Sequence, residues 1–378
     1  MSVRKHALRD QVGVEHDRYD VVVVGGGLAG VCAAIAAARA GLRLALVHNR
    51  TVLGGNSSSE IRVWVCGATS HGEHHYARET GIMGELFVEN QYRNRDGNPY
   101  YWDQLLLEKV LAEPGIRLLL GTHVDEVEVE DGDQGRTIVA VGAVMAGSER
   151  VFRLEAEQFV DASGDGTVGF LAGARYRTGR ESHAEYGEKL APVEPDDETL
   201  GSTILFYVRD AGHPVRYVAP PWAVDIASTS VPTTRYISPA ANGCAYWWIE
   251  LGGDRDVVHD DDQLRLELQG AALGVWDYIK NSGRFDADDL TLEWVGSVPG
   301  RREYRRFVGD HTLTEQDILA QAQHSDTVAF GGWSLDLHPR GDLRPGAGLA
   351  PRVLGRDLRH PPAGALRPRP REPVGRGP

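Results

Sequence analysis

The chain has 378 residues, of which 42% are hydrophobic and 25% charged, a composition typical of a globular protein long enough for two domains. Its formal net charge of −14 argues against nucleic acid as a partner, because phosphate binding requires a basic face. The three cysteines, Cys32, Cys66 and Cys244, are too few and too scattered for a disulfide framework or a zinc site. No apolar run approaches membrane-spanning length and the N-terminus lacks an apolar signal core, so we expect a cytoplasmic protein without a membrane partner.

Residues 1–18 are predicted to be a polar extension, and a strand, a glycine turn and a helix follow it. The β-branched run at 21–24 leads into Gly25, Gly27 and Gly30, which stand at G-x-G-x-x-G spacing. The first glycine permits the tight turn, the second lets a pyrophosphate approach the backbone, and the third lets helix and strand pack closely. The helix N-terminus offers free N–H groups to phosphates. The pattern predicts a dinucleotide-binding unit; the alternative is a glycine turn in an ordinary α/β fold.

The next elements alternate between strands and helices and then change period. Hydrophobic spacing predicts further parallel strands at 43–47 and 116–120, and helices at 28–40, 81–90 and 102–113. After them, β-rich runs separated by turns predict a three-stranded antiparallel meander at 124–130, 137–145 and 150–156, followed by a separate strand at 158–161. We expect residues 19–173 to form a first domain.

The rest of the chain divides into a second domain and a tail. Residues 174–338 mix strands with one strong helix at 262–281 and are predicted to be a substrate domain. Residues 339–378 contain nine Pro, seven Gly and nine Arg, but no Lys, Ile, Phe, Tyr or Trp. Such a segment cannot bury enough apolar area to offset its ordering entropy. We therefore expect a natural disordered tail, or the product of a frameshift in a gene rich in G and C.

The end of the second strand departs from the fingerprint of nicotinamide-binding proteins. An acidic residue normally binds the ribose hydroxyls there, whereas this strand ends in His48, Asn49 and Arg50. Either His48 or Asn49 is able to hydrogen-bond a ribose hydroxyl. Arg50 would suit a 2′-phosphate instead, which requires a nicotinamide cofactor.

Two further glycine motifs favour FAD over a nicotinamide cofactor. The segment 53–60, LGGNSSSE, follows the second strand directly and offers N–H and hydroxyl groups to a pyrophosphate and a flavin edge. The segment 159–166, FVDASGDG, is a strand that enters a glycine turn after the meander. In this layout the turn returns near the first glycine loop.

Together with later segments, these motifs resemble those of the FAD-dependent oxidoreductase family, within the large two-domain flavoprotein superfamily. The later segments are VWDYIKNSG at 275–283, VPGRREYRRFVGDHTLTEQDI at 298–318 and GGWSLDLHP at 331–339. The resemblance covers roughly residues 19–338. It implies an α/β fold, with a Rossmann-like FAD-binding domain of parallel sheet and antiparallel β-meander and a mixed α+β substrate domain.

The resemblance also implies which residues line the FAD. They come from the three glycine motifs: Gly25, Gly27, Gly30, Gly54, Gly55, Asn56, Ser57, Ala162, Gly164 and Asp165. Val124, after His123, would lie near the adenine. Such proteins normally end with a strand and a glycine-rich turn beside the flavin, and the tail after His338 shows neither. An inactive, truncated flavoprotein fragment is therefore one alternative.

Candidate catalytic residues come from the arginine-rich segment 301–306. If this segment is a strand, Arg302 faces one side and Arg305 the other. Arginines can clamp a carboxylate or stabilise negative charge on a reduced flavin, which makes Arg302 and Arg305 the catalytic candidates. The alternative is a solvated strand held by salt bridges.

Other side chains are weaker candidates. Arg62 and His71 lie close to the second glycine motif, and Trp247-Trp248 suits packing better than a stacking wall for a flat substrate. The run HGEHH at 71–75 is not expected to bind a metal, because adjacent histidines point in different directions on any regular element.

The leading hypothesis is an FAD-dependent oxidoreductase that transfers a hydride between a small-molecule substrate and flavin. The protein would supply orientation and electrostatics for that transfer. An NAD(P)-dependent dehydrogenase is the alternative from a different enzyme class. A bound yellow chromophore would discriminate between them.

Overall fold

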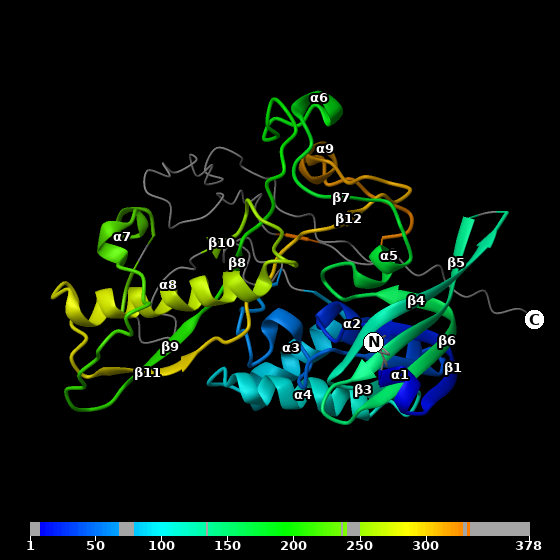
Figure 1. Cartoon of the computed structure of the whole chain (residues 1–378), viewed down its shortest axis with the longest axis horizontal. Coiled ribbons are helices and arrows are strands. Elements are labelled where there is room, and N and C mark those ends of the chain that lie inside the picture. Colours follow the sequence, from blue (N-terminus) through cyan, green and yellow to red (C-terminus); the bar gives the residue numbers. More distant parts are fainter. Residues whose placement is uncertain are drawn as a thin grey trace, which may run out of the picture.

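The computed structural model describes residues 8–67, 79–133, 135–235, 237–239, 250–327 and 331–332. Its centre is a six-stranded sheet with the order β3-β2-β1-β6-β5-β4 (Figure 1). The strands are β1 (Val14–Val24), β2 (Leu44–Val47), β3 (Ile116–Leu119), β4 (Thr122–Gly132), β5 (Gly135–Met145) and β6 (Arg150–Asp161). Strands β3, β2, β1 and β6 are parallel, and β5 and β4 continue the sheet in antiparallel pairing. The fold is α/β with a Rossmann-like sheet, as predicted.

Helices cover one face of the parallel strands, and the period of β1 shows why. Val21 and Val23 pack in a core with α2 (Leu28–Arg39), α3 (Gly81–Arg93) and α4 (Pro99–Leu111). Val22 and Val24 point to the opposite face, because successive side chains of a strand alternate. On that face they join a core that includes residues of the meander, such as Phe152 of β6. All four valines are buried, which explains their unbroken β-branched run.

Two boundaries of this domain differ from the prediction. Residues 14–18 are not part of a polar extension, because they form the first half of β1 and pair with residues 151–155 of β6. The expected strands at 150–156 and 158–161 are one continuous strand, β6, so the meander and the parallel strands share one sheet. A short helix, α1 (Leu8–Gln11), precedes β1.

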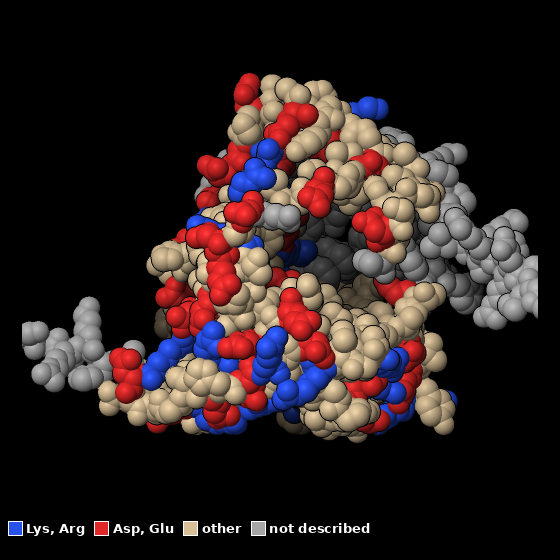
Figure 2. Space-filling model, turned by 90° about the vertical axis from the view of Figure 1, so that its right-hand side faces the viewer, with Lys and Arg blue, Asp and Glu red and all other residues tan. Residues whose placement is uncertain are grey.

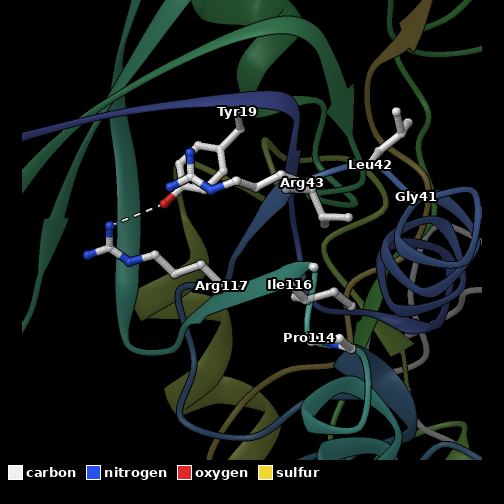
Figure 3. A pocket seen from close by; sticks show the side chains of 9 residues that line it. Tyr19, Gly41, Leu42, Arg43, Pro114, Ile116 and Arg117 are labelled. Atoms are coloured by element: carbon white, nitrogen blue, oxygen red, sulfur yellow. Dashed lines mark hydrogen bonds between the residues drawn. The ribbon is translucent and has the colours of Figure 1, made fainter.

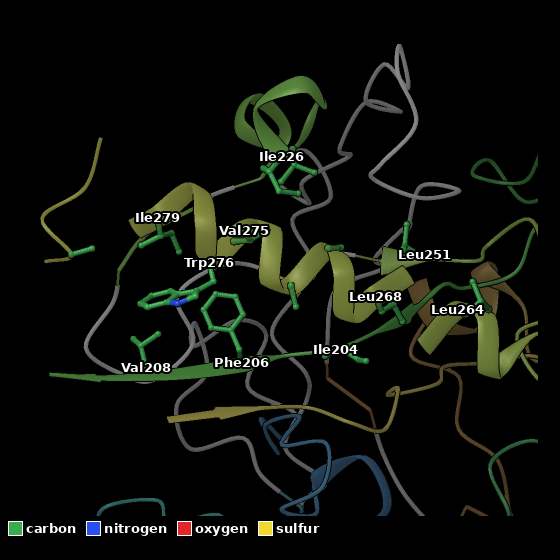
Figure 4. Packing of buried hydrophobic residues seen from close by; sticks show 14 of the residues in the cluster. Ile204, Phe206, Val208, Ile226, Leu251, Leu264, Leu268, Val275, Trp276 and Ile279 are labelled. Carbon is green, nitrogen blue, oxygen red and sulfur yellow. The ribbon is translucent and has the colours of Figure 1, made fainter. Parts of the chain in front are cut away.

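A second core is built on the long helix α8 (Asp261–Asn281), close to the predicted helix. Figure 4 shows Trp276 and Val275 of α8 above Phe206 and Val208 of β9 (Phe206–Asp210). Strand β11 (Leu290–Val295) pairs with β9, and β10 (Glu250–Leu251) pairs with β8 (Ser202–Thr203). These elements fit the expected mixed α+β domain, whose exact boundaries stay a prediction.

The remaining elements named here are short. They are the helices α5 (Thr167–Leu171), α6 (His183–Tyr186), α7 (Val231–Thr234) and α9 (Glu315–Leu319), and the two-residue strands β7 (Tyr176–Arg177) and β12 (Arg306–Phe307). Strand β12 pairs with β7, which joins the segment after α5 to the arginine-rich segment. His71, Trp247-Trp248 and the tail 339–378 lie outside the described residues.

Candidate functional site

The three glycine motifs meet at the carboxyl ends of β1, β2 and β6. The N–H of Gly54 donates to the carbonyl of Gly26 over 2.8 Å, and Gly27 and Gly54 form an isolated parallel bridge. The N–H of Ala162 donates to the carbonyl of Val24, also over 2.8 Å. The sequence order had suggested this meeting, and the carboxyl edge of a parallel sheet is where such folds bind ligands.

Two of the first motif's glycines are required by close packing, and the third leaves space. A Cβ on Gly25, whose φ is +113°, would lie 2.0 Å from the carbonyl oxygen of Ala162. A Cβ on Gly30 would lie 1.8 Å from the carbonyl oxygen of Gly25. For Gly27 the nearest atom is 4.0 Å away, on Gly55. Of these three glycines, only Gly27 leaves room for an added Cβ without a clash.

The start of α2 fits an anion. Gly27 caps the helix without a side-chain hydrogen bond, and the first turn contains no acidic residue. The N–H groups of that turn and the positive end of the helix dipole are thus left for a bound phosphate. Gly164 of the third loop, with φ of +84°, has no atom of the described residues within 4 Å of its Cβ position.

His48 contacts the first glycine loop, and its predicted bond to a ribose hydroxyl stays a prediction. Its side chain is 6% exposed, and its Nδ1 accepts a hydrogen bond from the N–H of Gly26 over 2.9 Å. Burial, with a smaller contribution from the charge of Arg50, lowers the pKa of His48 to about 4 against a backbone hydrogen bond at Val52 that raises it. The neutral imidazole thus holds the first glycine loop, whereas Asn49 is exposed at the end of β2.

Val124 lies at the same edge. The N–H of Thr122 donates to the carbonyl of His48 over 2.8 Å, which brings the start of β4 to the end of β2. The side chain of Val124 is 3% exposed and belongs to the core, so only its main chain is available to an adenine. Strand β4 is at the edge of the sheet order, where main-chain groups can face outward.

Asn56 and Ser57 fix the second loop. The hydroxyl of Ser57 donates to the carbonyl of Gly54 over 2.9 Å and accepts from the indole N–H of Trp102 over 3.0 Å. The side-chain amide of Asn56 donates to the carbonyl of Arg301 over 2.8 Å. Gly54 and Gly55 have φ of +111° and +58°, which a non-glycine residue rarely adopts. The loop's side chains are engaged with protein, so its backbone is the part suited to a cofactor.

Asp165 ties the third loop to the arginine-rich segment. Its carboxylate pairs with Arg301 at 2.9 Å, and its carbonyl accepts from Arg305 over 2.9 Å. Burial raises the pKa of Asp165, while the charges of Arg301 and Arg305 act in the opposite direction. The loop itself is braced by Asp161, whose carboxylate accepts from the N–H groups of Ser163 and Gly169.

The two predicted catalytic arginines point to different partners. The segment 301–305 is irregular rather than a strand, because strand pairing begins only at Arg306. Arg302 donates to Glu250 over 2.8 Å, and the Glu250 side chain is only 2% exposed. Arg305 lies 4.1 Å from the centre of the Phe170 ring in addition to its bond to Asp165. Both guanidinium groups are thus engaged with protein, and a direct role in catalysis stays a prediction.

A cavity of about 190 Å³ adjoins the second glycine loop. Its walls include Ser57 of that loop, Arg62 and Trp64 from the segment after it, Trp102 of α4 and Tyr207 of β9. Sequence reasoning had named Arg62 as a weak candidate and had missed Tyr207 and Trp102. No local signal marks these two, since positions 62, 102 and 207 are brought together only by the fold.

A second cavity lies at the opposite ends of the same strands. It has a volume of about 310 Å³ and is lined by residues 41–44 and 114–117 with Tyr19. Figure 3 shows Arg43 beside the Tyr19 ring, whose hydroxyl accepts from Arg117 over 3.1 Å. It is thus separated from the glycine loops by the length of the sheet.

Outside the glycine loops, the surface charges and the acidic, histidine and cysteine side chains bear on whether the chain has a further binding or metal site. On the face shown in Figure 2, basic and acidic side chains are interspersed over the lower part, and acidic ones are more frequent above. Within the described part of the chain, no group of three or more His, Cys, Asp or Glu side chains is arranged to hold a metal ion. Searched over the same residues, no helix is both long and apolar enough to span a membrane.

Solved structures similar to this chain include proteins named as a reductase-like protein, a monooxygenase and a dehydrogenase. A geranylgeranyl bacteriochlorophyll reductase-like protein from Thermoplasma acidophilum is 14% identical, with 75% of this chain and 66% of that chain covered and a TM-score of 0.37. The p-nitrophenol 4-monooxygenase from Pseudomonas putida DLL-E4 is 15% identical, with coverages of 77% and 68% and a TM-score of 0.37. L-proline dehydrogenase from P. horikoshii is 20% identical, with 40% of this chain and 24% of that chain covered and a TM-score of 0.24. The match thus spans about a quarter of that chain.

A search of curated proteins finds no match. The model of one protein family, described as FAD dependent oxidoreductase, matches residues 20–353. The match includes all three glycine motifs and the arginine-rich segment. The chain therefore belongs to the FAD-dependent oxidoreductase family, whose cofactor is FAD.

Proposed function

We propose that this chain binds FAD across its three glycine loops and transfers a hydride between a small-molecule substrate and the flavin. The observation that carries the proposal is the room beside the backbone of Gly27. Protein atoms occupy the space where a Cβ on Gly25 or Gly30 would lie. The nearest atom to a Cβ on Gly27 is 4.0 Å away. An uncapped helix start faces the same space, which supports a pyrophosphate there.

The residues present fit the cofactor along its length. The first turn of α2 would hold the pyrophosphate. Asn49, exposed at the end of β2, is better placed than the buried His48 to bond the ribose hydroxyls. The main chain of Val124 would contact the adenine, and the backbones of the second and third loops would contact the flavin side. FAD supplies hydride acceptor and donor chemistry, and the chain supplies position and charge.

The arginine-rich segment supports the position of the third loop. Arg301 pairs with Asp165, and Arg305 donates to the carbonyl of the same residue. Through Asn56, the carbonyl of Arg301 also contacts the second loop. We propose that these arginines act by holding two cofactor loops together, rather than by clamping a substrate.

The test measures cofactor content in the full chain. The purified protein is denatured, and the released cofactor is identified by chromatography and mass spectrometry. We expect FAD in the wild type and none in Gly27→Trp, because an indole would fill the pyrophosphate space. Gly13→Trp is the matched control, since Gly13 is exposed and no atom of the described residues lies within 4 Å of its Cβ position. Retention of a nicotinamide nucleotide in place of FAD, or unchanged FAD in Gly27→Trp, would contradict the proposal.

A further inference from the structure

Arg62 is a buried cation that forms no ion pair with the described acidic residues. It is 7% exposed, its Nε donates to the carbonyl of Ser59 over 3.2 Å, and its Nη2 donates to the hydroxyl of Tyr100 over 3.2 Å. Both acceptors are neutral. Among the residues that the structure describes, no Asp or Glu forms an ion pair with its guanidinium within 4.0 Å. The carboxylate of Asp103 accepts from the N–H of Ser59; burial raises the pKa of Asp103, and the more distant charge of Arg62 acts in the opposite direction. A buried charge normally has a partner of opposite sign, so this one suits an anion from outside the chain.

Three aromatic rings hold the guanidinium in one place. Its central carbon lies 4.1 Å from the ring centre of Trp294, 5.1 Å from that of Tyr207 and 5.4 Å from that of Tyr100. Tyr207 and Trp294 pack edge to face, and the Tyr207 hydroxyl accepts from the indole of Trp64 over 3.0 Å. These rings come from α4, β9 and β11, so both cores of the protein contribute to the frame around Arg62.

The backbone at Arg62 is strained. Its φ is +65°, a left-handed conformation that a long side chain adopts only at an energetic cost. Such strain persists where the surrounding structure imposes it and is concentrated at functional sites. Here the strain places a long cationic side chain under Tyr207 and Trp294.

The cavity of about 190 Å³ gives this cation a ligand-sized space. Arg62 lines it together with the apolar surfaces of Trp64, Phe87 and Tyr207. The two bonds to Ser59 and Tyr100 use two of the five guanidinium N–H groups. The remaining groups are the two on Nη1 and one on Nη2, and they are donors for the oxygens of a carboxylate. The second glycine loop adjoins the same cavity.

We propose that this cavity is the substrate site and that it takes a small organic acid with a flat apolar part. Arg62 binds the carboxylate, and Trp64, Phe87 and Tyr207 pack against the apolar part. That the bound acid is a substrate rests on the proposed flavin function. The binding of an anion by this cavity does not depend on that function. The proposal also assigns Arg62, rather than Arg302 or Arg305, as the residue that contacts the substrate.

The test uses sodium benzoate and its neutral analogue benzamide as probes of the purified full chain. Binding is measured by calorimetry and by quenching of tryptophan fluorescence, since Trp64 and Trp102 line the cavity. We expect benzoate to bind the wild type at least tenfold more tightly than benzamide. Equal binding of the two probes, or no binding of benzoate, would overturn the proposal without any variant being needed.

Variants locate the effect. We expect Arg62→Gln to weaken benzoate at least tenfold and Arg62→Lys to lose less. Arg43→Gln is the matched control, because Arg43 also lies over a tyrosine ring and lines the other cavity. Equal losses in Arg43→Gln and Arg62→Gln would overturn the proposal.

FAD content separates this proposal from the function proposed above. We expect Arg62→Gln to retain FAD. Loss of FAD from this variant would show that Arg62 contributes to cofactor binding and would overturn the substrate assignment. A wild type that contains FAD but does not bind benzoate contradicts only this inference. A wild type that binds benzoate but holds no FAD contradicts only the flavin function.

Discussion

The N–H of Gly26 donates to Nδ1 of His48 over 2.9 Å, and this bond joins the first glycine loop to the end of β2. A Cβ on Gly26 would lie 2.6 Å from the imidazole ring, so glycine is what lets the two groups meet. The bond requires a neutral imidazole with Nδ1 unprotonated. At the position where the dinucleotide-binding fingerprint has an acidic residue, this chain thus has a histidine that bonds its first glycine loop.

The first prediction concerns this bond. We expect His48→Leu to lower the free energy of unfolding by about 1–3 kcal/mol, because the N–H of Gly26 loses its acceptor. His48→Asn is the matched control, since an amide oxygen can occupy the place of Nδ1. Urea denaturation of the three proteins measures the difference. Equal stabilities of wild type and His48→Leu would show that the bond contributes nothing.

The second prediction is a pH dependence. The pKa of His48 is lowered to about 4 in the folded chain from an ordinary value of 6.5. Its contribution to stability is therefore complete above pH 6.5 and is lost as the pH falls toward 4, where protonation of the unfolded chain is favoured. The lost contribution is of the order of 3 kcal/mol.

Denaturation at a series of pH values checks this dependence. The stability difference between wild type and His48→Asn should change between pH 6.5 and 4, to the disadvantage of the wild type, and stay constant above that window. The amide that replaces the imidazole does not titrate, so other acidic and basic groups cancel in the comparison. A difference that is independent of pH would mean that His48 titrates alike in the folded and unfolded chains.

The third prediction concerns two glycines of the first motif, one needed for stability and the other for FAD binding. We expect Gly30→Ala to destabilise the chain by about 1–3 kcal/mol, because its methyl group would lie 1.8 Å from the carbonyl oxygen of Gly25. Gly27→Ala should cost less than about 1 kcal/mol, the scale of a helix-cap change, yet reduce FAD retention. Thermal unfolding and cofactor content are measured side by side. A Gly27→Ala chain that retains full FAD would place the pyrophosphate elsewhere.

Much of the first domain follows from local patterns. The buried valines of β1, the alanine-rich α2 and the turns of the meander are specified within a few residues of themselves. The first half of β1 is different, because His16, Asp17 and Arg18 have no strand-like pattern. Distant partners hold this part in the sheet, including Arg150, which bonds Glu15 over 2.6 Å. Sequence reasoning could not supply that partner.

The site divides in the same way. The glycine spacing predicted where three loops meet, because the reasons for glycine are local. The partners of Arg302 and Arg305 were not predictable, since Glu250 and Asp165 lie far away in sequence. The frame around Arg62 also depends on tertiary structure, because its rings stand at positions 100, 207 and 294.

The last prediction asks whether Arg302 is structural. Glu250 is buried and accepts from Arg302 over 2.8 Å, so Arg302→Met removes a charge partner of a buried carboxylate. We expect a loss of about 3–5 kcal/mol, the scale for breaking a buried ion pair. The double variant Arg302→Met with Glu250→Leu should recover most of this loss, because it replaces the whole pair with apolar groups.

A double-mutant cycle with Glu250→Leu alone completes the comparison, with stability and FAD content measured for all four proteins. A structural Arg302 predicts a large coupling energy and near-normal FAD in the double variant. If Arg302 is catalytic, the double variant should be stable and should contain FAD. Its flavin should then not be reduced by any substrate that reduces the flavin of the wild type. Because the guanidinium is already bonded to Glu250 of β10, we expect the structural outcome.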